Sequence, residues 1–134
     1  MIGLDTNVIV RYVTQDDVRQ AAAATRLFER VLSDENPGVI SLVTLCEIAW
    51  VLADCYGADK ARIHSVLEAL LASRQLLVDQ SELVWKALRA WEKSSADFSD
   101  ALVGELLTAR GCEKVMTFDK AAAKLPGFEL LTPA

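Results

Sequence analysis

The sequence predicts an α/β fold around a mostly parallel sheet, in a single domain that spans residues 1–134. Two observations carry this prediction. Short apolar runs of strand length alternate with segments of helical periodicity from one end of the chain to the other. The length of 134 residues suits one domain, and a hydrophobic content of 52% is enough for a core. No linker, internal repeat or low-complexity segment interrupts the pattern.

The first third of the chain is predicted to contain two strands with a helix between them. Residues 2–8 are an apolar opening that runs into Asp-Thr-Asn, which indicates a buried strand with Asp5 at its carboxyl end. Over residues 16–32 the apolar side chains fall close to helical spacing, and the Asn-Pro-Gly sequence at 36–38 turns the chain. Residues 39–41 are then predicted as a short second strand.

The remaining elements continue the alternation. A helix is predicted over residues 44–56, with Gly57 as its stop, and Asp59 starts the next one. The later elements are a strand at 76–78, a helix at 81–93, a helix from Asp97 to Arg110 that stops at Gly111, a strand at 114–117, a short helical turn after Asp119 and a strand at 128–131.

Composition narrows the possible functions. A net charge of -5 argues against a protein that binds nucleic acid through charge alone, but it permits an acidic site that a cation neutralises. The single histidine, His64, excludes a two-histidine acid/base nuclease within one chain, so in a hydrolase carboxylates must carry the chemistry. No apolar run approaches the roughly 20 residues of a membrane span, and the first residues lack the basic start and apolar core of a signal peptide. We therefore expect a cytoplasmic protein.

Four carboxylates occupy positions that suit a site. Asp5 and Asp119 follow predicted strands, and Glu47 and Asp100 lie in the first turns of predicted helices. Parallel connectivity brings strand ends and the starts of the following helices to one edge of a sheet. We expect Asp5, Glu47 and Asp119 to converge there. Clustered carboxylates repel one another unless a cation neutralises them, and hard oxygen ligands suit Mg²⁺ or Mn²⁺. The set could hold one or two ions.

Each of these carboxylates also has a purely structural interpretation. Asp5 can make a turn. Thr44 and Glu47 have the spacing of a capping box, in which Glu47 would accept from the backbone of Thr44. Asp97 with Asp100 can cap a helix, and Asp119 can cap the turn that follows it.

The motifs together resemble those of the PIN-domain ribonucleases, in particular the VapC-type toxins of bacterial toxin–antitoxin pairs. The motifs are Leu4-Asp5-Thr6-Asn7 at the start, Glu47 in the helix after the second strand, Asp97-Phe98-Ser99-Asp100-Ala101-Leu102 at a helix start and Thr117-Phe118-Asp119 after a strand. The order and spacing of all four, over essentially the whole chain, are more specific than any one of them.

The resemblance implies a three-layer α/β/α sandwich and metal-dependent cleavage of RNA by activated water, with Mg²⁺ or Mn²⁺ as the cofactor. Asp5, Glu47, Asp100 and Asp119 match the family's acidic quartet, as catalytic residues and metal ligands. Asp97 matches an additional acid of some members, and Asn7 and Thr117 match polar positions that support the site. The resemblance also implies a homodimer and a small antitoxin protein whose C-terminal tail lies across the active-site groove.

Three other residues have two interpretations each. Arg11 could contact an RNA phosphate, or it could be a solvated surface charge. Trp50 and Tyr56 lie in the helix after Glu47 and could line an antitoxin or dimer surface. The apolar neighbours of Trp50 favour core packing for that residue.

Two other functions remain as alternatives. One is another phosphoryl-transfer α/β domain, such as a phosphatase or receiver. These proteins need a second acid two residues after the nucleophile, where this chain has Asn7, or an acidic pair before it. The other is a catalytically silent, PIN-like binding module in which the acids are helix caps. Binding of Mn²⁺ would distinguish a nuclease from such a module.

Overall fold

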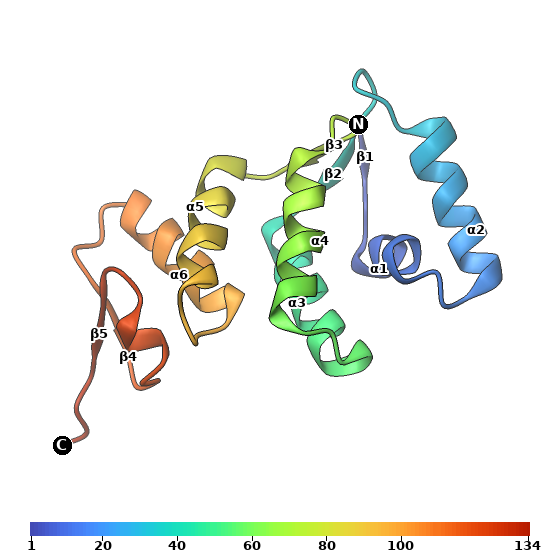
Figure 1. Ribbon diagram of the computed structural model, residues 1–134. Helices are drawn as coiled ribbons and strands as arrows, with labels where there is room; N and C mark the ends of the chain where they lie inside the picture. Colours follow the sequence, from blue (N-terminus) through green and yellow to red (C-terminus); the bar gives the residue numbers. More distant parts are fainter. The chain divides into compact units, whose positions relative to one another are not determined.

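The structure is a computed structural model that describes residues 1–134, and every strand pair in it is parallel. The chain divides into two compact units, Met1–Ser81 and Glu82–Ala134, each described here by itself (Figure 1). The first unit contains a three-stranded sheet in the order β1 (Ile2–Gly3), β2 (Gly38–Ile40) and β3 (Leu76–Val78). The second contains the strand pair β4 (Val115–Thr117) and β5 (Phe128–Leu130).

Four helices accompany the sheet of the first unit. They are α1 (Thr6–Thr14), α2 (Val18–Arg26) with its π-helical continuation η1 (Leu27–Val31), α3 (Leu42–Tyr56) and α4 (Lys60–Ala72). Helix α1 packs against α2 and α3, and α3 packs against α4, which lies beside it in Figure 1. Fully buried aliphatic side chains fill the space between sheet and helices, among them Ile9, Ile40, Leu45, Ile48 and Leu67.

The second unit contains α5 (Ser81–Glu92), α6 (Phe98–Ala109) and the 3₁₀ turn η2 (Ala122–Lys124). The rings of Trp91 and Phe98 meet edge to face, with centroids 5.8 Å apart, and the Trp91 indole N–H donates to the Ala96 carbonyl over 2.9 Å. A Cβ at Gly104 would lie 2.5 Å from Cε1 of Phe128. Glycine in the middle of α6 therefore lets the ring of Phe128 from β5 approach the helix closely.

The prediction of a strand over residues 2–8 is wrong beyond its start. Strand β1 ends at Gly3, and α1 begins at Thr6 with Asp5 as its N-cap residue. The β-branched run in this segment favours a strand by propensity, but tertiary contacts override such preferences. Ile9 and Val10 are both buried on the face of α1 that packs into the core. No helix was predicted at residues 6–14.

Most other element predictions are confirmed. Asp59 caps α4 through its side chain, and Gly57 ends α3 with a φ of 63°, both as predicted. Asp17, for which no cap was predicted, caps α2. Strand β3 spans the predicted residues. Trp50 is 62% exposed, so the interpretation of this side chain as part of the core is wrong. None of the helices has both the length and the apolar composition needed to cross a membrane.

Candidate active site

Thr6 donates hydrogen bonds to the carboxylates of both Asp5 and Glu47, so these two side chains lie close together. The backbone N–H of Thr6 donates to Oδ1 of Asp5 over 2.8 Å, and its hydroxyl donates to Oε1 of Glu47 over 3.1 Å. Asp5 follows β1, and Glu47 lies in the second turn of α3, the helix after β2. The parallel pairing of β1 and β2 brings these two positions to the same edge of the sheet, as expected.

The contact between Thr6 and Glu47 was not predicted from the sequence. Thr6 and Glu47 are separated by 41 positions, so no local pattern links them. The available signal was the position of Thr6 in the Asp-Thr-Asn motif, between two residues already assigned to the site.

The capping-box alternative for Glu47 is wrong. Helix α3 begins at Leu42, and Ser41 is its N-cap residue. The Ser41 hydroxyl oxygen accepts from the backbone N–H of Thr44 over 3.2 Å. The Glu47 side chain is exposed and bonds to Thr6 of α1 instead of the start of its own helix. Helix capping therefore does not account for a carboxylate at position 47.

A groove of about 450 Å³ contains Asp5 and Glu47. Helices α1 and α3 form its walls, and Asn7 and Arg11 line it beside the two carboxylates. Arg11 is the one cationic residue that lines this groove. A groove with two carboxylates, an amide and a guanidinium provides both ligands for a cation and a partner for a phosphate.

Hydrogen bonds hold Arg11 in a fixed position. Its Nε donates to Oε1 of Gln20 over 2.7 Å, and its Nη1 donates to the Tyr56 hydroxyl over 2.8 Å. The Tyr56 hydroxyl in turn donates to Oδ2 of Asp16 over 2.7 Å, and Oδ1 of Asp16 lies 3.4 Å from Nη1 of Arg11. The bonds from Tyr56 and Thr14 lower the pKa of Asp16, and the charge of Arg11 lowers it further. Arg11 is thus part of a network and not a freely solvated charge.

Asp97, Asp100 and Asp119 belong to the second unit. Oδ2 of Asp100 accepts from the backbone N–H of Asp97 over 3.2 Å. Oδ1 of Asp119 accepts from Ala121 N–H over 2.8 Å and from Ala122 N–H over 3.2 Å. The Thr117 hydroxyl oxygen accepts from the backbone N–H of Asp119 over 3.0 Å. The structural interpretations of Asp100 and Asp119 as caps are therefore confirmed, and the Thr117 hydroxyl contacts the backbone at Asp119.

The electrostatics of Asp100 differ from those of a simple cap. Burial raises the pKa of the Asp100 carboxyl. The bond from the Asp97 backbone opposes this effect, and the negative charges of Asp97 and Asp119 raise the pKa further. A cation close to Asp100 would stabilise the ionised form of this carboxyl. Asp100 is thus a group of the second unit whose ionised form a metal ion would favour.

The carboxylate oxygens of the predicted site are chemically suited to a hard divalent cation. The hydrogen bonds described above use Oδ1 of Asp5, Oε1 of Glu47, Oδ2 of Asp100 and Oδ1 of Asp119. The second oxygen of each carboxylate takes no part in these bonds, and such oxygens are the ligands that Mg²⁺ and Mn²⁺ prefer. No three acidic, histidine or cysteine side chains form a complete metal site. Convergence of all four carboxylates on one metal site therefore stays a prediction.

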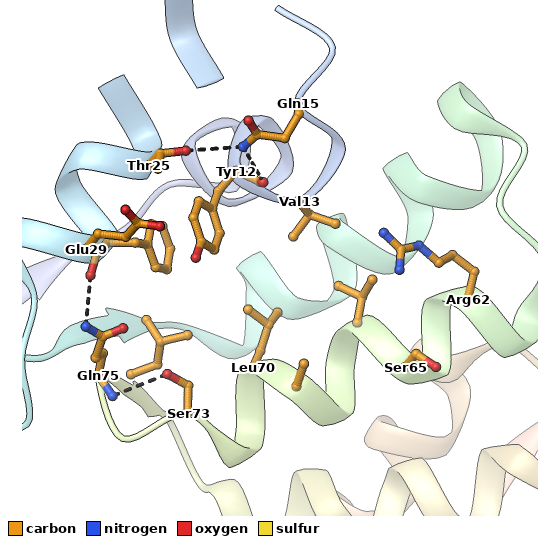
Figure 2. Close-up of a pocket in the computed structure, with 14 residues that line it drawn as sticks. Tyr12, Val13, Gln15, Thr25, Glu29, Arg62, Ser65, Leu70, Ser73 and Gln75 are labelled. Atoms are coloured by element: carbon orange, nitrogen blue, oxygen red, sulfur yellow. Dashed lines mark hydrogen bonds between the residues drawn. The ribbon is translucent and has the colours of Figure 1, made fainter. Parts of the chain in front are cut away.

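A second, roomier hollow of about 600 Å³ lies elsewhere in the first unit (Figure 2). Apolar side chains, including Leu70, form much of its surface, and Tyr12 stacks on Phe28 with ring centroids 4.1 Å apart. Its one carboxylate is Glu29, and none of the predicted site residues lines it. A larger volume does not make this hollow the better candidate, because it lacks a cluster of catalytic groups.

Comparison with known proteins identifies the family to which the chain belongs. The family model described as PIN domain matches residues 2–127 and so extends across both units. The chain is also 21% identical to the VapC ribonuclease of Aquifex aeolicus (strain VF5) over 130 residues, which are 97% of this chain and 95% of that protein. The predicted family resemblance is confirmed, and with it the predicted PIN-like α/β fold class.

Proposed function

Because the chain belongs to the PIN domain family, we propose that it is a metal-dependent endoribonuclease and the toxin of a toxin–antitoxin pair. The observation that carries the proposal is the pairing of Asp5 with Glu47 through Thr6, in a groove that also contains Arg11. The similarity to a VapC ribonuclease along nearly the whole chain supports RNA as the substrate. The site of action is proposed to be the cytoplasm.

The metal ligands are proposed to be the four carboxylates of the family pattern. Asp5 and Asp100 ligate the principal Mg²⁺ or Mn²⁺ ion, and Glu47 and Asp119 complete the site directly or through water. Asp97 is a further candidate ligand. The site takes one ion or two. A divalent cation at such a site supplies positive charge, which lowers the pKa of water and neutralises the phosphodiester.

The other residues orient the reacting groups. Thr6 holds the Glu47 carboxylate through its hydroxyl, and Thr117 holds the backbone at Asp119. Asn7 lines the groove beside Asp5 and is proposed to orient the carboxylates. The guanidinium of Arg11, held by Gln20 and Tyr56, binds a phosphate of the RNA. A pre-positioned guanidinium loses little entropy when it binds a phosphate.

The proposed partners follow from the family pattern. A small antitoxin protein is proposed to place its C-terminal tail across the groove that contains Asp5 and Glu47. This tail would exclude RNA by occupying the same surface. The active protein is proposed to be a homodimer. Size-exclusion chromatography of the purified protein, alone and with the product of a neighbouring small gene, measures both assemblies.

Cleavage of bulk cellular RNA tests the proposal. The purified protein is incubated with RNA and Mn²⁺ or Mg²⁺, with EDTA in a parallel sample, and Asp5→Asn is compared with the wild type. Asparagine is as good an N-cap residue as aspartate, so α1 should remain intact in this variant. Asp17 is also an N-cap residue, of α2, and it lies outside the groove, so Asp17→Asn is the matched control.

We expect discrete fragments that require metal, that Asp5→Asn does not produce and that Asp17→Asn does. Full activity of Asp5→Asn would refute the assignment of this carboxylate. A calorimetric titration with Mn²⁺ separates a nuclease from a silent binding module. A metal site predicts binding that Asp100→Asn weakens, whereas carboxylates that serve only as caps predict no affinity for Mn²⁺.

A further inference from the structure

A small hollow continues from the catalytic groove along α1. It has a volume of about 320 Å³ and lies between α1 and α2. Asn7 and Arg11 line both this hollow and the groove that contains Asp5 and Glu47. A bound chain whose phosphate contacts Arg11 therefore has direct access to the hollow.

The walls of the hollow suit a flat, mostly apolar group. They are formed by Val8 of α1 and by Ala23, Ala24 and Leu27 on the other side. The alanine side chains leave open space where larger residues would fill it. The volume is at the lower end of the roughly 300–1,000 Å³ found for small-molecule pockets. The hollow therefore has room for one ring system with its sugar and not for a longer segment.

Side-chain amide groups lie on the rim of the hollow, and they form hydrogen bonds with a defined direction. The side-chain oxygen of Gln20 accepts from Arg11 over 2.7 Å, so the amide group of Gln20 keeps its two N–H donors for a ligand. Asn7 presents a second amide on the opposite helix. Amide groups pair with the hydrogen-bonding edges of nucleobases, while apolar walls pack on their faces.

We propose that this hollow is a subsite for one unpaired nucleobase of the RNA substrate, next to the phosphate that Arg11 binds. The inference rests on the proposed ribonuclease function and deepens it by naming the residues that would hold one base of the substrate. A base can enter the hollow only when it is unstacked and unpaired, because the bases of an A-form helix are stacked in its interior.

The test uses an oligoribonucleotide that spans a cut site mapped in bulk cellular RNA. Abasic nucleotides replace the bases around the cut, one at a time, and kcat/KM is measured for each substrate. Loss of the base that occupies the hollow should lower kcat/KM about tenfold.

Ala23→Leu fills the hollow from an exposed position on α2, and leucine is a good helix former. Ala22→Leu is the matched control, because Ala22 is also exposed, precedes Ala23 and does not line the hollow. We expect Ala23→Leu to lower kcat/KM for the intact oligonucleotide about tenfold and to be insensitive to the critical abasic substitution. Ala22→Leu should behave like the wild type.

The outcomes distinguish the two levels of the proposal. If the wild-type protein cleaves RNA but no single abasic substitution lowers kcat/KM, the subsite is refuted while the ribonuclease function stands. The same holds if Ala23→Leu cleaves normally, or if it impairs only binding of a protein antitoxin. Absence of any cleavage by the wild type overturns both. The abasic substrates are measured with the wild-type protein, so this measurement remains valid even if Ala23→Leu has a folding defect.

Discussion

Removal of the Thr6 hydroxyl measures how much the proposed site depends on a fixed Glu47. Thr6→Val keeps the shape and the β-branch of the side chain but removes the donor to Oε1 of Glu47. The N-cap bond to Asp5 uses the backbone N–H of Thr6, so this bond survives the change. The variant therefore releases Glu47 without disturbing the cap of α1.

The structure sets the size of the expected effect. Hydrogen bonds to charged groups contribute roughly 1.5–3 kcal/mol, but Glu47 is exposed and Thr6 is half-buried, so water replaces part of the lost bond. A net loss of about 1 kcal/mol corresponds to a decrease in kcat/KM of about fivefold. The Mn²⁺ concentration that gives half-maximal activity should rise as well, because a mobile carboxylate is a poorer ligand.

The assay is cleavage of the mapped oligoribonucleotide over a range of Mn²⁺ concentrations by the wild type, Thr6→Val and Thr6→Ser. Serine retains the hydroxyl and should restore both kcat/KM and the Mn²⁺ midpoint. The melting temperatures should stay within a few degrees of each other, which excludes a general loss of stability. Unchanged activity and an unchanged Mn²⁺ midpoint in Thr6→Val would refute the role of Thr6 in holding Glu47.

Two further predictions concern the second unit. Because the pKa of Asp100 is raised in the folded protein, its ionisation opposes folding, and metal-free stability falls as pH rises from the ordinary Asp range through the raised pKa. Denaturant titrations should therefore show that Asp100→Asn gains stability over the wild type at pH 7 but not at pH 3. Gly104→Ala gains about 1 kcal/mol of helix propensity but puts a Cβ 2.5 Å from Phe128. Overpacking of about 1–3 kcal/mol should dominate, so thermal melts should show a loss of about 1 kcal/mol that Phe128→Leu relieves. An equally stable or more stable Gly104→Ala would show that the ring moves away freely.

The sequence alone was sufficient to predict the features that depend on neighbouring residues. The side chain of Asp59 caps α4 at the predicted helix start, and Gly57 stops α3 in a left-handed conformation as predicted. These features depend on a few neighbouring residues, because a cap satisfies the free backbone groups of the adjacent turn. The alternation of strands and helices, and hence the parallel fold class, could be predicted for the same reason.

Prediction failed where contacts across the chain decide the conformation. Residues 6–10 have strand propensity, yet burial of Ile9 and Val10 against the core makes them part of a helix. The helical periodicity around Trp50 could not reveal which face of α3 is covered, and the ring is 62% exposed. Packing partners from distant segments determine both outcomes, and their identity is not encoded in the local sequence.

For the candidate site, too, some features could be predicted from the sequence and others are determined only by the folded structure. The sequence predicted that Asp5 and Glu47 lie together, because carboxylates after strands and at helix starts form a recognisable pattern. The structure alone showed that Thr6 joins them, that Ser41 takes the capping role expected of Thr44 with Glu47, and that Tyr56 holds Arg11. A hydrogen bond between helices depends on their packing and on side-chain direction, and both arise only when the chain folds.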